Sequence, residues 1–160
     1  MDTPQHLVEL SRRVAASPAA VWEVITDLDH AQERLSQVTA LHVITAGPYA
    51  VGTRWRETRR MMGASDTQEL VVVANDPLRS TTLEAVDGGT RYTTSLRLES
   101  LDDAAATLVT VRFSADIADP GRLQRLALKV VGPLGLKLTE KSLRTELDDI
   151  AAAAEALPSA

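Results

Sequence analysis

The sequence predicts an α+β domain in which seven antiparallel strands pack against a long C-terminal helix. Three observations support this prediction. Apolar residues recur at helical spacing through the last quarter of the chain, six strand-like segments joined by short turns fill its middle, and two short helical segments follow the first strand. With 160 residues and no linker, internal repeat or low-complexity stretch, the chain is expected to form a single domain, residues 1–160.

The N-terminal part of the chain combines a strand with two short helices. Residues 6–14 alternate between two faces and predict a strand. Ser17 is a favourable helix N-cap, and Pro18 suits the first helical position because its φ is already fixed near the helical value. We expect this helix to end at Asp27 and a further short helical turn to form at 31–35.

Six more strands are predicted in the middle of the chain, at residues 38–46, 53–62, 67–74, 79–86, 91–99 and 108–117. A four-residue turn, 63–66, is expected to join the second and third of them. Asp87-Gly88-Gly89-Thr90 is the strongest hairpin signal, because Asp-Gly and Gly-Gly accept the positive φ that a tight hairpin needs. Because short turns join successive strands, we expect them to pair as antiparallel neighbours.

The long helix is predicted over residues 134–157, which would span about 36 Å at the helical rise. Before it, Asp119-Pro120 predicts another helix start, and Gly132-Pro133 predicts a break or kink. A helix this long needs a wide partner surface, which a seven-stranded sheet would provide. Its apolar stripe repeats at spacings of seven, four, three, four and three residues, through Leu136, Leu143, Leu147, Ile150, Ala154 and Leu157.

Composition narrows the classes of protein. The chain has no Cys, so we expect no disulfide, thiol nucleophile or thiolate metal site. The N-terminal residues lack the apolar core of a signal peptide, and no apolar run reaches the length of about 18 residues that predicts a membrane span. The net charge of −5 argues against a nucleic-acid partner. We therefore expect a cytoplasmic protein with no transmembrane segment.

Several stretches of sequence, taken in order, carry a family resemblance: VAASPAAVWEVITDLDH at 14–30, GPYAVGTRWRETRRMMG at 47–63, TQE at 67–69, NDPLR at 75–79, DGGTRYT at 87–93 and GPLGLKLTEKSLRTELDDIAAAAEA at 132–156. Together they resemble the START-like helix-grip superfamily (the SRPBCC group) and, within it, the polyketide cyclase/dehydrase-like proteins, over nearly the whole chain. The resemblance implies a curved sheet that grips the C-terminal helix, with a cavity between them that commonly holds an apolar or amphipathic small molecule. Members include cyclases, carriers and sensors, so the resemblance leaves the activity open.

The strand predicted at 53–62 carries the first candidate site. Strand alternation places Trp55, Glu57, Arg59 and Met61 on one face, which we expect to turn toward the helix. Charges in an apolar interior are costly unless they are paired, hydrogen-bonded or solvated. One interpretation is that Glu57 and Arg59 form a polar floor that orients a ligand, with Glu57 as a general base if burial raises its pKa. The alternative is a Glu–Arg pair that holds the sheet together or lies at the wetted mouth of the cavity.

Further candidates come from a later strand and from the helix. Tyr92 is expected either in the pocket, where its hydroxyl would hydrogen-bond a ligand, or near a sheet edge with its hydroxyl in water. A carboxylate pair formed by Glu57 and Glu69 would be a catalytic signal only if both face inward, which depends on the strand register. After Gly132-Pro133 the helix is expected to face the pocket. The predicted ligand-binding residues are therefore Trp55, Glu57, Arg59, Met61, Tyr92, Leu138 and Ser142.

No motif in the chain assigns catalytic residues, a cofactor or a metal. The three histidines, His6, His30 and His42, lie far apart and show no metal-ligand spacing. No nucleophile elbow, P-loop or dinucleotide-binding fingerprint is present. We expect no metal and no cofactor, and the catalytic residues stay unassigned.

Three functions are considered. The first is a binder of a small apolar or amphipathic molecule, held between the sheet and the C-terminal helix. The second is an enzyme of the cyclase/dehydratase type, in which Glu57, Arg59 and Tyr92 would supply proton transfer and oxyanion stabilisation. The third is a peripheral membrane or protein-interaction module, and the sequence is compatible with a monomer or a homodimer.

The third function would depend on six basic residues between positions 122 and 144. The alternative is a solvated helix face on which Arg144 pairs with Glu140 and Asp148 at helical spacing.

Overall fold

The computed structural model describes residues 6–61, 63–87, 89–117 and 133–158. The strands are β1 (His6–Val14), β2 (Val38–Val43), β3 (Arg54–Met61), β4 (Ala64–Asp76), β5 (Ser80–Asp87), β6 (Thr90–Leu101) and β7 (Ala106–Ile117). The helices are α1 (Pro18–Thr26), a single 3-10 turn, η1 (Leu28–His30), α2 (Ala31–Arg34) and α4 (Pro133–Ala156).

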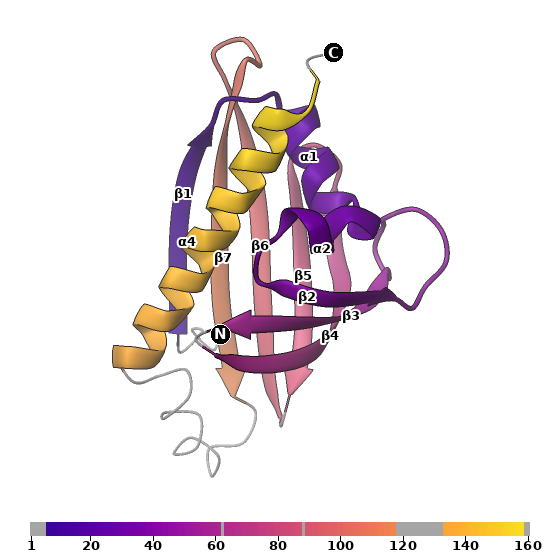
Figure 1. Cartoon of the computed structure of the whole chain (residues 1–160), viewed down its shortest axis with the longest axis vertical. Coiled ribbons are helices and arrows are strands. Elements are labelled where there is room, and N and C mark those ends of the chain that lie inside the picture. Colours follow the sequence, from indigo (N-terminus) through magenta and orange to yellow (C-terminus); the bar gives the residue numbers. More distant parts are fainter. Residues whose placement is uncertain (1–5, 62, 88, 118–132, 159–160) are drawn as a thin grey trace.

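The seven strands form one antiparallel sheet in the order β1-β7-β6-β5-β4-β3-β2. Figure 1 shows β5, β6 and β7 running along the molecule, β2, β3 and β4 crossing in front of their lower part, and α4 lying diagonally over the same face. The sheet bends in this way because each strand is twisted relative to its neighbour. The predicted fold class is confirmed: an α+β helix-grip domain with a curved seven-stranded sheet and two short helices after the first strand.

The start of α1 follows the predicted chemistry. Ser17 is the N-cap, and its Oγ accepts a hydrogen bond from the backbone N–H of Ala20 at 3.2 Å. Pro18 occupies the first helical position. Val21 and Val24 are buried, so the helix is held to the rest of the domain by its apolar side.

Turn chemistry explains where one predicted boundary is wrong. The expected four-residue turn at 63–66 has only two residues, because Met61 already pairs with Ala64. Gly63 has a φ of +80°, which a tight hairpin requires and which glycine adopts without strain. Residues 64–66 therefore belong to β4. The hairpin between Asp87 and Thr90, which pair directly, is confirmed.

The strand predicted at 38–46 is also shorter than expected. It ends at Val43, because the amides of Ile44 and Thr45 both donate to the carbonyl of Arg54, at 2.9 and 3.3 Å. Two donors on one carbonyl interrupt the regular ladder. The chain then leaves the sheet edge as the loop that precedes β3.

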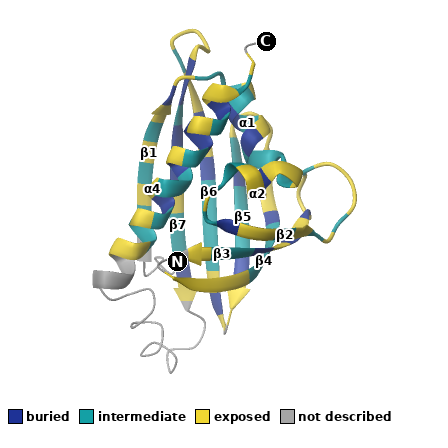
Figure 2. Ribbon diagram, in the orientation of Figure 1, coloured by how far each residue is buried: buried dark blue, intermediate teal, exposed yellow. Residues whose placement is uncertain are grey.

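The main core lies between α4, α1 and the strands β1, β6 and β7. Its buried members are Val14, Val21, Val24, Leu96, Leu98, Val109, Val111, Leu143, Leu147, Ile150, Ala151 and Ala154. Figure 2 shows buried residues along the sheet-facing side of α4 and exposed residues along the opposite side. This confirms the predicted stripe from Leu143 to Ala154. The side chain of Leu136 and the predicted helix start at Asp119-Pro120 lie outside the described residues.

None of the helices in the described ranges is long and apolar enough to cross a bilayer.

Candidate functional site

Strand β3 presents its polar residues to the interior of the domain. Trp55 and Glu57 are buried, with 3% and 7% of their surface exposed, whereas Arg54, Arg56 and Arg60 on the other face are exposed. Alternation along a strand produces this division. The predicted facing of Trp55 and Glu57 is confirmed, and Arg59 shares their face.

Glu57 is held by two donors on its own strand. The indole Nε1–H of Trp55 donates to Glu57 Oε2 at 3.1 Å, and Arg59 Nε donates to Glu57 Oε1 at 2.6 Å. Both oxygens of the carboxylate are therefore used as acceptors, and the two bonds fix its orientation.

A second carboxylate, from α4, completes the group. Arg59 Nη1 and Nη2 donate to the two oxygens of Glu146, each at 3.1 Å, which is the bidentate geometry that a guanidinium forms with a carboxylate. Burial alone would lower the pKa of Arg59, but the charges of Glu146 and Glu57 outweigh it and raise that pKa above its usual range. The ion triad, defined as Glu57, Arg59 and Glu146, thus ties β3 to α4.

Sequence reasoning missed Glu146. The signal was available, because Glu146 follows Ser142 by one helical turn, so the face predicted to contain Ser142 also contains Glu146. The structural alternative predicted a Glu57–Arg59 pair that holds the sheet together. That pair is present, but through Glu146 it ties the sheet to α4 and directs two carboxylates into the interior.

An aromatic cluster adjoins the ion triad and was also missed. Tyr49, in the loop before β3, lies with its ring centroid 6.3 Å from that of Trp55 and 6.5 Å from that of Trp22 on α1. The Tyr49 hydroxyl hydrogen-bonds to Thr81 Oγ1 at 2.7 Å. Burial raises the pKa of Tyr49, and the hydrogen bond with Thr81 opposes part of that rise. The chain has only five Trp, Tyr and Phe residues, so three in one cluster is a marked concentration.

Tyr92 lies on β6, separately from the ion triad. It is half-buried, and its ring stacks on Phe113 with centroids 6.0 Å apart and planes 21° apart. Burial raises the pKa of its hydroxyl, the negative charges of Asp87 and Asp66 raise it further, and the nearby Thr90 hydroxyl opposes the rise. The phenol is therefore protonated, and available as a hydrogen-bond donor, over the whole neutral range.

The predicted helix contacts have different surroundings. Ser142 Oγ donates to Gln37 Oε1 at 2.7 Å, and Gln37 Nε2 donates to the carbonyl of Ser142 at 2.9 Å. Ser142 therefore fastens the loop before β2 to α4. Leu138 is 36% exposed. Met61 ends β3, and its side chain lies outside the described residues.

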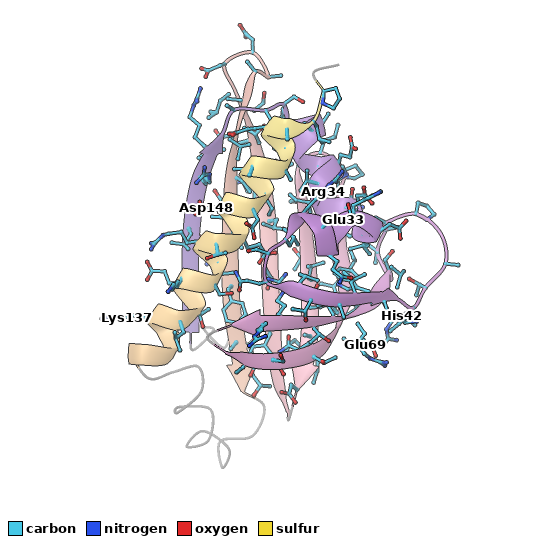
Figure 3. All side chains as sticks on the ribbon, viewed as in Figure 1. Glu33, Arg34, His42, Glu69, Lys137 and Asp148 are labelled. Carbon is cyan, nitrogen blue, oxygen red and sulfur yellow. The ribbon has the colours of Figure 1, made fainter. Side chains whose placement is uncertain are left out.

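The remaining carboxylate and histidine candidates lie on the outside. Glu69 faces away from Glu57, since its carboxylate contacts Arg54 at 2.5 Å and Arg56 at 3.7 Å. Figure 3 shows Glu69 and His42 near each other, away from α4. The two glutamates therefore do not form the inward pair that would signal catalysis.

His30 is exposed and hydrogen-bonded to Asp27 at 2.7 Å. Within the described ranges, no three His, Asp or Glu side chains gather in a way that could hold a metal ion.

The basic segment is described only from position 133 onward. There Lys137, Lys141 and Arg144 are exposed, and Arg144 pairs with Glu140 at 2.8 Å as the solvated-face alternative predicts. The expected second partner is wrong, because Asp148 instead pairs with Arg12 of β1. Asp148 thus pairs with a base on the neighbouring strand, while Arg144 pairs with Glu140 on its own helix.

An open cleft of about 530 Å³ lies at the other end of the sheet, beside the turn between β4 and β5. None of the seven predicted ligand-binding residues lines it. Its walls are formed by Pro18, Asp76, Leu78, Arg79, Ser80, Arg97, Leu98, Glu99 and Ser100.

Comparison with known proteins gives consistent results. Residues 5–155 match the model of the family described as polyketide cyclase / dehydrase and lipid transport. Among solved structures, a START superfamily protein from Mycobacterium smegmatis is similar with a TM-score of 0.75 and 16% identity, covering 96% of this chain and 99% of that one.

Two enzymes have similar folds. The Zhui aromatase/cyclase from Streptomyces sp. R1128 gives a TM-score of 0.72 at 20% identity, with 94% of this chain and 93% of that one covered. Norcoclaurine synthase from Thalictrum flavum gives 0.72 at 16% identity, with 96% and 95% covered. No curated protein matches the sequence. At these identities the structural likeness concerns the fold.

Proposed function

Because the chain belongs to the polyketide cyclase / dehydrase and lipid transport family, we propose that it binds a small apolar or amphipathic molecule between the sheet and α4. The contacts proposed for this molecule are Trp55, Glu57, Arg59, Met61, Tyr92, Leu138 and Ser142. The family resemblance predicts the location of this site, and the polar groups at it are those of the ion triad.

The observation that carries the proposal is the ion triad, with the indole of Trp55 attached to it. Glu57 is buried, with 7% of its surface exposed. Because packed apolar residues often stabilise a protein as much as a buried ion pair does, stability alone does not explain these charges. Arg59 has a raised pKa, and a perturbed ionisable group on an inner face is a candidate for a functional site. The aromatic cluster adds large apolar surfaces beside it, so one region offers both apolar contact and polar orientation.

Binding is favoured over the cyclase/dehydratase alternative by the way Glu57 is held. Each of its oxygens accepts a hydrogen bond from a fixed donor on the same strand, so neither oxygen is free to reach a substrate proton. A general base needs a pKa near the working pH and free reach to the proton that it removes. Tyr92, protonated at neutral pH and outside the triad, is the better-placed acid if the protein is an enzyme, as the aromatase/cyclase with a similar fold is.

The proposal is tested by native mass spectrometry of freshly purified protein. Under native conditions we expect a mass above that of the 160-residue chain. Under denaturing conditions the bound molecule should be released, and the mass should return to that of the chain alone. A bare chain from several hosts, together with failure to bind any added amphiphile, would contradict it. Glu57→Gln distinguishes the two functions: an enzyme that uses Glu57 loses turnover, whereas a binder still retains the molecule and changes at most in its affinity.

A further inference from the structure

A β-bulge in β4 turns a polar side chain toward the interior. The pairing of β4 with β5 shifts by one residue between Val72 and Ala74, so Val73 is the extra residue of the bulge. A shift of one residue reverses the facing of every residue that follows it. Regular alternation from the buried Val72 would place Asn75 on the outer face, but after the bulge Asn75 faces inward and Val73 is left 38% exposed.

The cross-strand partner of Asn75 has the same inward facing. Asn75 pairs directly with Thr81, which is 1% exposed, and Thr81 in turn pairs with the core residue Leu96. Directly paired residues lie on the same face of a sheet. Asn75 as a whole is half-buried, so it lies at the border of the interior, where a bound molecule can reach it.

The amide oxygen of Asn75 is buried without a hydrogen bond. Its Oδ1 is shielded from solvent and has no partner among the residues that the structure describes. A buried acceptor without a donor lowers stability, because it has given up its hydrogen bonds to water, and such groups are uncommon in folded proteins. This oxygen can accept a hydrogen bond from a molecule that brings a donor.

The two hydroxyls nearest in the structure cannot supply that donor, because both of their hydrogens are already used. Thr81 Oγ1 donates to the carbonyl of Ala74 at 3.4 Å. Since a threonine hydroxyl has a single hydrogen, the Tyr49 hydroxyl must be the donor in its 2.7 Å hydrogen bond with Thr81. The oxygen of Asn75 is therefore left for a donor that belongs to neither side chain.

Trp55 lies between Asn75 and the ion triad. Along the paired strands β3 and β4, Glu57 comes first, Trp55 follows, and Asn75 lies on β4 beyond the partner of Trp55. The Tyr49 ring, with its centroid 6.3 Å from that of Trp55, reaches the partner of Asn75 through its hydroxyl. A molecule whose apolar body lies against Trp55 would therefore have the triad on one side and Asn75 on the other.

We propose that Asn75 is a specificity-determining residue, whose Oδ1 accepts a hydrogen bond from an uncharged donor, such as a hydroxyl, on the bound molecule. This inference rests on the proposed function, since it adds a second polar contact to the same site. The donor is uncharged because a charged group would lose its hydration there, and the Asn75 amide offers it no opposite charge. An ether oxygen at this place would meet another acceptor and leave Oδ1 unpartnered.

The test compares three probes with the same ring system: 2-naphthol, 2-methoxynaphthalene and naphthalene. Their binding to the full chain is measured by equilibrium dialysis at pH 7, where the naphthol hydroxyl, like that of tyrosine, is uncharged. Only 2-naphthol can donate a hydrogen bond. We expect it to bind about three- to tenfold more tightly than either of the other two, which is the contribution of one hydrogen bond between uncharged groups.

Two variants locate the effect. Asn75→Leu replaces the amide by an apolar side chain with the same branching, so the preference for 2-naphthol should fall below about twofold. Its free energy of unfolding in urea titrations should not decrease, because within the described residues the buried oxygen forms no hydrogen bond that the substitution could break. Thr82→Val, on the outer face of β5 opposite Ala74, is the matched control and should keep the preference of the parent protein.

The outcomes separate this inference from the proposed function. If 2-naphthol is not preferred, or if Asn75→Leu keeps the preference, the inference is overturned and the binding function stands. A loss of stability in Asn75→Leu would assign a structural role to the amide and would also overturn it.

Native mass spectrometry supplies a second comparison, which does not depend on the probes. If a molecule co-purifies with the parent protein and Asn75→Leu retains it as fully, the inference is overturned and the binding function stands. If no molecule co-purifies and neither the probes nor any added amphiphile binds, the proposed function fails and this inference falls with it.

Discussion

Arg59→Met removes the guanidinium from the ion triad and keeps most of the side-chain volume. It breaks hydrogen bonds of 2.6, 3.1 and 3.1 Å and leaves Glu57 and Glu146 without a counter-charge. Removing one partner of a buried ion pair costs about 3–5 kcal/mol. Because 21% of the Arg59 side chain is exposed, water would solvate part of the remaining charge. We therefore expect the free energy of unfolding to fall by about 2–3 kcal/mol.

The assay is urea unfolding at pH 7, followed by far-ultraviolet circular dichroism. Arg56→Met is the matched control, because it lies on the same strand, faces outward with 57% of its side chain exposed, and approaches Glu69 only to 3.7 Å. Exposed pairs of this kind contribute under about 1 kcal/mol. The reasoning is refuted if both variants lose the same stability.

Two smaller predictions concern other parts of the site. The pKa values of Tyr49 and Tyr92 are both raised, so their ultraviolet tyrosinate signal should appear above pH 10 in the folded protein and near pH 10 in urea. The free energy of unfolding should therefore fall as the pH rises through that window. Titration of both tyrosines near pH 10 in the folded protein would contradict this. Ser142→Ala removes the hydrogen bond to Gln37 and should lower the free energy of unfolding by about 1 kcal/mol in urea titrations, whereas Ser65→Ala on exposed β4 should change it by under about 0.5 kcal/mol.

Local sequence patterns predicted the features that depend on residues close together in the chain. Ser17-Pro18, the hairpin at Asp87 and the stripe from Leu143 onward all appear where their local chemistry indicates. Trp55 and Glu57 were placed correctly because a buried strand has two faces and only one carries a tryptophan.

Contacts between distant elements could not be predicted in the same way. Whether Glu69 faces inward depends on the strand register, and a shift of one residue reverses the answer. The partner of Arg59 came from α4, 87 positions away, and the partner of Asp148 came from β1. Such pairings follow from how the sheet curves around the helix, which no local pattern encodes.

The central claim is that a ligand binds between β3 and α4. The most direct test is a crystal structure of the protein with a co-purified molecule or with an added amphiphile. The account predicts ligand density against Trp55 and the ion triad. Density in the open cleft near Leu98, with none against Trp55 or the ion triad, would contradict it.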